Sequence, residues 1–239
     1  MSVFVILPAA GLGTRMASGH HAPQQPKQFL ALDGTPVLIH TLRAFAAVPA
    51  VSSMVLAVRP TEIARVEEQV AEFGLADKVR VVAGGDSRQS SVSSALAAID
   101  CAADDLILVH DAVRPLIEPA VIARTIEAVE RTGAAIVGLP AVDTIKQVER
   151  TADGALITAT IPREYVVQAQ TPQGFRADLL RRAFAEAEAD GFGGTDEASL
   201  VERSGIPVVV VPGSPSNMKI TQPGDLELAT FYLHQRASR

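Results

Sequence analysis

The sequence predicts an α/β protein whose parallel sheet carries helices on both faces, with a β-hairpin arm added late in the chain. Two observations predict this fold class. Short apolar runs alternate with segments of helical periodicity through the first 140 residues, which is the pattern of a doubly wound parallel sheet. After Pro140 the alternation stops, and two short strand patterns follow each other across a tight turn. With 239 residues, 48% of them hydrophobic and 20% charged, the composition is that of a soluble globular protein.

The alternating part contains five expected strands and four expected helices. Each strand is a short run of buried type, and each helix repeats apolar residues every three or four positions. The strands are Val3–Leu7, Met54–Val58, Val79–Val82, Leu106–Val109 and Ala135–Leu139. The helices are Pro36–Ala46, Pro60–Phe73, Ser90–Ile99 and Pro119–Arg131, the second of them stopped by Gly74.

The arm is expected at about residues 143–163. Thr144–Val148 and Leu156–Thr160 read as two strands joined by a turn at Thr151–Gly154. A hairpin does not continue a parallel winding, so we expect it to project and to pack on a second subunit. Helices at Ala177–Ala189 and Asp196–Ser204, a strand at Val208–Val211 and a final helix from about Pro223 complete the pattern. No linker or repeat interrupts the chain, which is therefore expected to be one domain over residues 1–239.

Composition narrows the class of protein. The net charge of −6 argues against a nucleic-acid partner, because such proteins usually carry a basic excess. The single Cys101 rules out an internal disulfide and is typical of a reducing compartment. No segment is apolar for long enough to span a bilayer, and the N-terminal apolar run lacks the basic region of a signal peptide. We therefore expect a cytoplasmic protein without a membrane partner.

A glycine loop after the first strand is the strongest sign of function. Pro8, Ala9, Ala10, Gly11 and Gly13 form a loop of small residues whose amides can face phosphate oxygens. Arg15 and Lys27 add two cations to it. The dinucleotide fingerprint is excluded because the third glycine is missing, and the P-loop is excluded because no Gly-Lys-Ser/Thr follows. The combination favours a nucleoside triphosphate.

Further polar residues follow the third and fourth strands, at the sheet edge where ligands of parallel sheets bind. Asp86 and Ser91, next to Gly85, could contact a base or ribose, but helix capping by Asp86 or Ser87 is the favoured reading of that segment alone. Asp111 could hold Mg²⁺, since this ion prefers oxygen ligands and shares them with substrate phosphates. A buried turn carboxylate paired with Arg114 is an equal alternative.

Three other residues have a structural and a functional interpretation. His110, at a strand end, is read as structural. Thr195 reads as a helix N-cap that could also touch a ligand. Lys219 lies in an apolar stretch where a charge needs a partner, which a phosphate would supply.

Eight motifs in fixed order resemble the 2-C-methyl-D-erythritol 4-phosphate cytidylyltransferase family. They are PAAGLGTRM, PKQFL, GGDSRQSSV, HDAVRP, DTIK, QTPQGF, TDEAS and NMKIT, and the match runs from about Val3 to the final helix. The resemblance implies a Rossmann-like nucleotidyltransferase sheet and a β-arm that interlocks a homodimer. It also implies transfer of CMP from CTP to methylerythritol phosphate with release of pyrophosphate, in non-mevalonate isoprenoid synthesis, with Mg²⁺ or another divalent ion.

The resemblance also implies roles for individual residues. The expected catalytic residues are Arg15, Lys27, Lys219 and Asp111, the last as metal ligand. The expected nucleotide contacts are Pro8, Ala9, Ala10, Gly11, Gly13, Gly85, Asp86 and Ser91. The expected sugar-phosphate contacts are Arg114, Thr144, Arg163, Thr171 and Thr195, some of them donated across the dimer. The loop Ala17–Gln25 is longer than expected for the family.

Other assignments stay open at this point. Ribitol 5-phosphate cytidylyltransferase shares the fold and the nucleotide, but Lys146 in the DTIK run and the TDEAS motif favour the isoprenoid enzyme. In an NADP-dependent oxidoreductase Arg59 would bind the extra phosphate, and the missing third glycine counts against this. A non-catalytic nucleotide sensor is disfavoured by the combination of Arg15, Lys27, Asp111 and Lys219.

Overall fold

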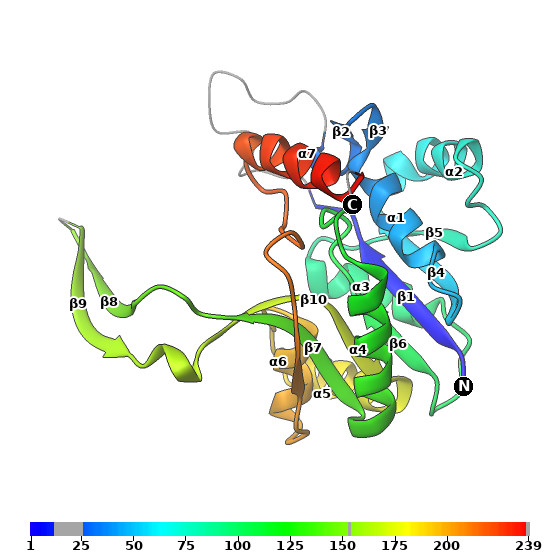
Figure 1. The fold of residues 1–239 in the computed structure, drawn as a ribbon. Coiled ribbons are helices and arrows are strands. Elements are labelled where there is room, and N and C mark those ends of the chain that lie inside the picture. The colour runs from blue at the N-terminus through cyan, green and yellow to red at the C-terminus, as the bar shows by residue number, and fades with distance from the viewer. Residues whose placement is uncertain (12–25, 153, 238–239) are drawn as a thin grey trace.

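The structure, a computed structural model, describes residues 1–11, 26–152 and 154–237. Its centre is a seven-stranded sheet in the order β11-β7-β10-β6-β1-β4-β5 (Figure 1). These strands are β1 (Val3–Pro8), β4 (Val51–Val58), β5 (Val79–Ala83), β6 (Leu106–Val109), β7 (Ala134–Pro140), β10 (Val167–Arg176) and β11 (Val209–Pro212). The pairs β1/β4, β1/β6, β4/β5 and β7/β11 are parallel. The mostly parallel α/β fold expected from the sequence is confirmed.

The sheet residues alternate between two apolar clusters, as the period of two in a strand requires. One face packs against α1 (Val37–Ala46), α2 (Ile63–Glu72) and α4 (Pro119–Thr132). The other packs against α3 (Arg88–Ala97), α5 (Ala177–Ala189) and α6 (Glu197–Arg203). Thus Leu7 and Leu56 face the first set of helices while Ile6 and Val55 face the second. Helix α7 (Pro223–Ala237) packs on a third, smaller cluster with Leu32 and Val113.

Strand β10 is not among the strands expected from the sequence. It lies between β6 and β7 and is antiparallel to both, with a register shift between Ala169 and Gln173. The sequence did not predict this strand because Pro172 has no backbone N–H to donate to a neighbouring strand and because Gln170 and Gln173 are polar. Both glutamines are nevertheless buried. The β10 strand carries Thr171 to the end of β6, beside Asp111.

The expected hairpin is present as a separate two-stranded sheet of β8 (Ile145–Thr151) and β9 (Gly154–Ile161). Figure 1 shows it extending away from the seven-stranded sheet. Small elements complete the fold: β2 (Ala31–Leu32), β3 (Thr35–Pro36) and the 3-10 turns η2 (Lys27–Phe29), η3 (Pro60–Glu62) and η4 (Arg163–Tyr165). Within the described residues, no helix is long and apolar enough to cross a membrane.

Candidate functional site

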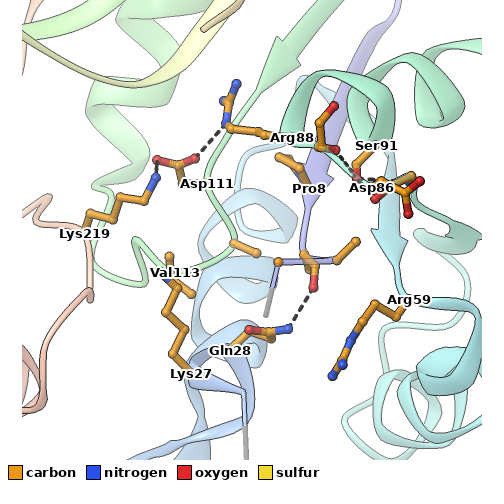
Figure 2. A pocket seen from close by; sticks show the side chains of 16 residues that line it. Pro8, Lys27, Gln28, Arg59, Asp86, Arg88, Ser91, Asp111, Val113 and Lys219 are labelled. Carbon is orange, nitrogen blue, oxygen red and sulfur yellow. Dashed lines mark hydrogen bonds and ion pairs between the residues drawn. The ribbon is translucent and has the colours of Figure 1, made fainter. Parts of the chain in front are cut away.

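A pocket of about 330 Å³ opens where β1, β5 and β6 end (Figure 2). This is the edge at which ligands of open parallel sheets bind. Most of the residues singled out from the sequence meet there. The lining residues are Pro8, Ala9, Ala10, Gly11, Lys27, Gln28, Arg59, Gly85, Asp86, Ser87, Arg88, Ser91, Asp111, Ala112, Val113 and Lys219.

The loop after β1 is tied to the turn that carries Lys27. Gln28 is buried, and its Nε2 donates to the Ala9 carbonyl at 2.8 Å. This bond places Lys27, the first residue of η2, beside the small residues of the loop. A Cβ at Gly84 would lie 2.8 Å from that of Ala10, so this position has no room for a side chain. Gly84 therefore lets the loop after β5 pack closely against the loop after β1.

The loop after β5 is fixed by serine side chains. Ser87 is the N-cap of α3 and accepts from the Ser90 backbone N–H, so the capping interpretation is confirmed for Ser87. Ser91 Oγ accepts from the Gly85 backbone N–H at 3.1 Å. Asp86 makes no cap and lines the pocket.

Three cations surround the carboxylate of Asp111. Its Oδ2 lies 2.9 Å from Lys219 Nζ and 3.2 Å from Arg114 Nε, and its Oδ1 lies 3.3 Å from Arg88 Nε. Burial acts to raise the pKa of Asp111, but Lys219, Arg88 and Arg114 outweigh it and hold the pKa well below its usual range. Asp111 is therefore ionised at neutral pH. The pairing with Arg114, one of the two alternatives left open for Asp111, is present, and the partner of Lys219 in the structure is this carboxylate.

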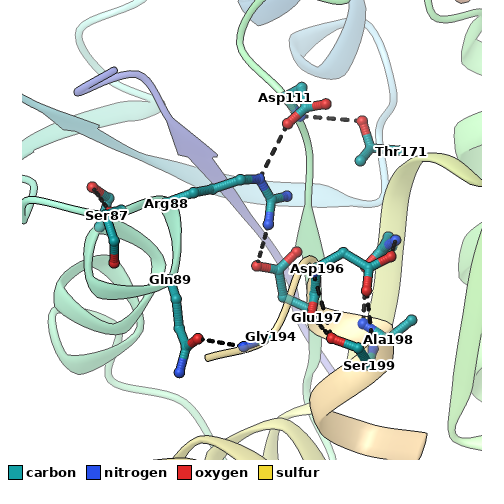
Figure 3. Close-up of polar contacts among 12 residues, drawn as sticks. Ser87, Arg88, Gln89, Asp111, Thr171, Gly194, Asp196, Glu197, Ala198 and Ser199 are labelled. Carbon is teal, nitrogen blue, oxygen red and sulfur yellow. Dashed lines mark hydrogen bonds and ion pairs between the residues drawn. The ribbon is translucent and has the colours of Figure 1, made fainter. Parts of the chain in front are cut away.

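Arg88 continues the charge cluster toward helix α6 (Figure 3). Its Nη1 donates to Glu197 Oε1 at 2.7 Å, and Glu197 is only 1% exposed. Burial raises the pKa of Glu197 despite the attraction of Arg88. The second carboxylate oxygen, Oε2, has no hydrogen-bond partner in the described part of the chain.

His110 is a neutral residue that is linked to the backbone of Asp111 through Thr171. Its Nε2 faces the Arg114 carbonyl at 3.1 Å, and because a carbonyl only accepts, Nε2 carries the proton. Its Nδ1 then accepts from the Thr171 hydroxyl, whose oxygen accepts from the Asp111 backbone N–H. Complete burial lowers the pKa of His110 to about 3, so the ring is neutral. The structural interpretation of His110 is confirmed.

Some expected site residues lie away from the pocket lining. Arg114 and Thr171 contact Asp111 but do not line the pocket. Thr144, Arg163 and Thr195 do not line it either. The prediction that Thr195 is an N-cap is wrong by one residue: Asp196 caps α6, since its side chain accepts from the Ser199 backbone N–H. Gly13, Arg15 and the loop Ala17–Gln25 lie outside the described residues.

Four residues of the site were missed as site residues or assigned elsewhere. Gln28 and Arg88 stand inside the quoted motifs but were given no role. Glu197 looked like an acid in the first turn of a helix, and only the fold brings it to Arg88. Arg59 was considered only for NADP, yet it lines the pocket at the end of β4. A cation directly after a glycine loop, as in Gly85-Asp86-Ser87-Arg88, was the available signal for Arg88.

The pocket combines a glycine loop, the N-terminus of a helix capped by Ser87, and a cluster of cations at one edge of a mostly parallel sheet. These features define a nucleotide-binding α/β protein of the nucleotidyltransferase class. The family model for 2-C-methyl-D-erythritol 4-phosphate cytidylyltransferase (IspD) matches residues 3–235. The chain belongs to this family, and it is thus a cytidylyltransferase.

Individual relatives agree with the family match. The chain is 82% identical to 2-C-methyl-D-erythritol 4-phosphate cytidylyltransferase of Acidobacterium capsulatum, over 100% of both chains. It is 53% identical to the protein of that name from Solibacter usitatus, over 100% of this chain and 98% of the relative. The crystal structure of the Francisella tularensis protein of that name is 33% identical and superposes with a TM-score of 0.80, covering 97% of this chain and 99% of that one.

Proposed function

We propose that the pocket catalyses the reaction of its family: CMP transfer from CTP to 2-C-methyl-D-erythritol 4-phosphate, a step of non-mevalonate isoprenoid biosynthesis. The products are 4-diphosphocytidyl-2-C-methyl-D-erythritol and pyrophosphate. The single observation that carries the proposal is the placement of Lys27, Arg88 and Lys219 around one pocket at the end of β1 and β6. A ribitol phosphate acceptor is not favoured, because the family and its close relatives carry the methylerythritol name.

The chemistry is a displacement at the α-phosphorus of CTP. A phosphate oxygen of methylerythritol phosphate forms a new bond to that phosphorus. The bond from the phosphorus to the bridging oxygen breaks, and its electron pair leaves on pyrophosphate. The nucleophile is largely dianionic at neutral pH because the second pKa of a phosphate monoester is about 6. No proton has to be removed, which is consistent with a neutral, fully buried His110.

The main barrier is the approach of two anions, so the residues act by positioning and by neutralising charge. Lys27 stands beside the loop after β1, and Lys219 and Arg88 stand across the pocket, as Figure 2 shows. The ion pairs of Asp111 with Lys219, Arg88 and Arg114 hold these side chains together before the substrate arrives, so little reorganisation is needed during the reaction.

A divalent ion such as Mg²⁺ fits Asp111 only if the substrate supplies most of its ligands. The described residues contain no group of three or more potential metal-binding side chains, and both Asp111 oxygens already face cations. Among the described residues, Oδ1 receives one hydrogen bond, from Arg88, and it keeps a lone pair for a cation. Mg²⁺ is commonly bound by one or two carboxylates together with substrate phosphates. The ion would add positive charge beside the phosphates.

A homodimer formed through the arm, residues 143–163, is part of the proposal. The hairpin exposes apolar side chains: Leu156 and Ile157 are 62% and 60% exposed among the described residues. A lone hairpin is marginal in water and gains stability by packing on a surface. Thr144 and Arg163 lie at the base of this arm, so a partner's arm would bring them to an acceptor site. The remaining acceptor residues would be Arg114, Thr171 and Thr195.

The substrate assignment is tested by pyrophosphate release. We expect release with CTP, a divalent metal and methylerythritol phosphate together, and none when any one is left out or the metal is chelated. Ribitol 5-phosphate should be much slower as acceptor. Faster release with ribitol 5-phosphate would move the protein to the competing assignment, and NADP binding without CTP binding would exclude both.

Arg163→Lys should raise KM for methylerythritol phosphate about tenfold and leave KM for CTP nearly unchanged. Arginine can hold a phosphate through two parallel hydrogen bonds, and lysine's single charge does not reproduce this. In the described chain Arg163 Nη1 donates to the Val142 carbonyl, and Arg163 does not line the pocket of its own subunit. Its contact with the sugar phosphate would therefore be made in the pocket of the partner subunit. Steady-state kinetics with each substrate varied, together with light scattering for the dimer mass, check this. An active monomer would refute the role of the arm.

A further inference from the structure

Glu197 and Arg88 join two helices on the same face of the sheet, α6 and α3. Their contact is the shortest ion pair of the cluster described above, at 2.7 Å between Oε1 and Nη1. Arg88 uses its Nε for Asp111, so one guanidinium group connects a buried carboxylate to the carboxylate at the pocket (Figure 3).

Stability does not explain this ion pair. A carboxylate that is 1% exposed loses its hydration, and burial raises the pKa of Glu197, so its ionised form is disfavoured in the fold. Only one of its oxygens has a partner among the described residues. Replacing a whole buried ion pair by apolar residues of similar volume is often neutral or stabilising, so such a pair is weak evidence for a stabilising role. The retained charge therefore points to a functional role.

Other bonds already fix the two helices relative to each other. Gln173 of β10 donates through Nε2 to Asp196 Oδ2 at 2.7 Å and accepts from the Ala198 backbone N–H at 3.0 Å. Gln89, next to Arg88, accepts from the Gly194 backbone N–H at 2.9 Å. The backbone at the start of α6 is thus held in a fixed place, from which the Glu197 side chain can orient Arg88.

We propose that Glu197 is a positioning residue for CMP transfer: it sets the orientation of the Arg88 guanidinium and, through it, the place of the Asp111 carboxylate. This inference rests on the proposed function. Two carboxylates against three cations leave the resting cluster with one positive charge. Glu197→Gln would leave two positive charges, which by charge alone would favour binding of the CTP anion. A positioning role instead predicts slower turnover.

The test is Glu197→Gln, with Glu202→Gln as the matched control. Glu202 is an exposed acid on the same helix and contacts nothing in the cluster. We expect Glu197→Gln to lower kcat on the order of tenfold without raising KM for CTP, because the amide keeps only a weaker, neutral hydrogen bond to Arg88. Its Tm should stay close to that of the wild type, because Arg88 keeps Asp111 as an ionised partner and its side chain is 29% exposed. Glu202→Gln should leave kcat and Tm unchanged. An unchanged kcat in Glu197→Gln would overturn the inference.

A double-mutant cycle separates positioning from a general structural effect. If Glu197 acts through Arg88, then Glu197→Gln should cause no further loss of kcat in an Arg88→Met background. A full additional loss in that background would contradict the proposal. The kcat of Arg88→Lys is a second test of the proposal, and it does not depend on whether Glu197→Gln folds. Lysine keeps the charge but cannot span both carboxylates, so its kcat should also fall; wild-type kcat in Arg88→Lys would reject the bridge.

The same experiments distinguish failure of this inference from failure of the proposed function. If the wild-type protein released no pyrophosphate from CTP with methylerythritol phosphate, the proposed function would be lost and this inference with it. If the wild-type protein were active and the Glu197 and Arg88 variants matched it, only this inference would be lost.

Discussion

Lys27→Ala is expected to lower kcat by about a hundredfold or more, with a much smaller change in KM for CTP. A cation that meets the phosphates mainly as charge develops stabilises the transition state more than the bound substrate. Removing it therefore lowers kcat and kcat/KM together, which is the kinetic sign of an interaction made in the transition state.

The position of Lys27 supports this expectation. The Gln28 side chain fixes the η2 turn to the carbonyl of Ala9, so Lys27 stands next to the loop expected to hold the phosphates. Lys78→Ala is the matched control, since Lys78 donates to the Ala46 carbonyl and does not line the pocket. Initial rates with CTP varied at saturating acceptor give both constants. A near-normal kcat with a raised KM would make Lys27 a ground-state binding residue.

The parallel part of the fold could be predicted because burial on both faces gives continuous apolar runs, as in Leu106–Val109. Strand β10 could not, because its polar residues are satisfied only by partners distant in sequence. Gln173 bonds Asp196, and Gln170 Nε2 donates to the Ser214 carbonyl. Neither partner is visible from the strand's own pattern, so the segment reads as a loop with a proline.

The functional site also has a part that the sequence could predict and a part that it could not. The rule that ligands meet the carboxyl ends of parallel strands was sufficient to bring together Gly11, Asp86 and Asp111, since each lies within three residues of the end of a strand. Lys219 was predicted to need a partner, but the choice of Asp111 depends on a contact across more than a hundred residues. The Arg88–Glu197 pair has the same origin. The local sequence indicates that a charged residue needs a partner, but only the tertiary structure identifies which residue the partner is.

Asp111→Asn is expected to reduce kcat/KM by about a thousandfold and also to destabilise the fold. The asparagine keeps the shape but takes the carboxylate away from Arg114 and Lys219 and leaves Arg88 with Glu197 as its only remaining carboxylate among the described residues. Loss of one member of a buried pair costs about 3–5 kcal/mol. We expect the lower end, ~3 kcal/mol, because the Arg88 and Lys219 side chains are 29% and 31% exposed and regain hydration.

For a chain of this length that loss corresponds to a fall in Tm of about 6–12 °C. Asp105→Asn is the matched control: Asp105 is a buried carboxylate that accepts from the Ser2 and Ala102 backbone N–H groups, away from the pocket. It should lower Tm while leaving kcat near normal. Thermal melts with and without CTP add a further check. Because CTP supplies the anion that the variant lacks, it should raise the Tm of Asp111→Asn more than that of the wild type. Equal shifts in the two proteins would show that the carboxylate and the triphosphate do not share these cations.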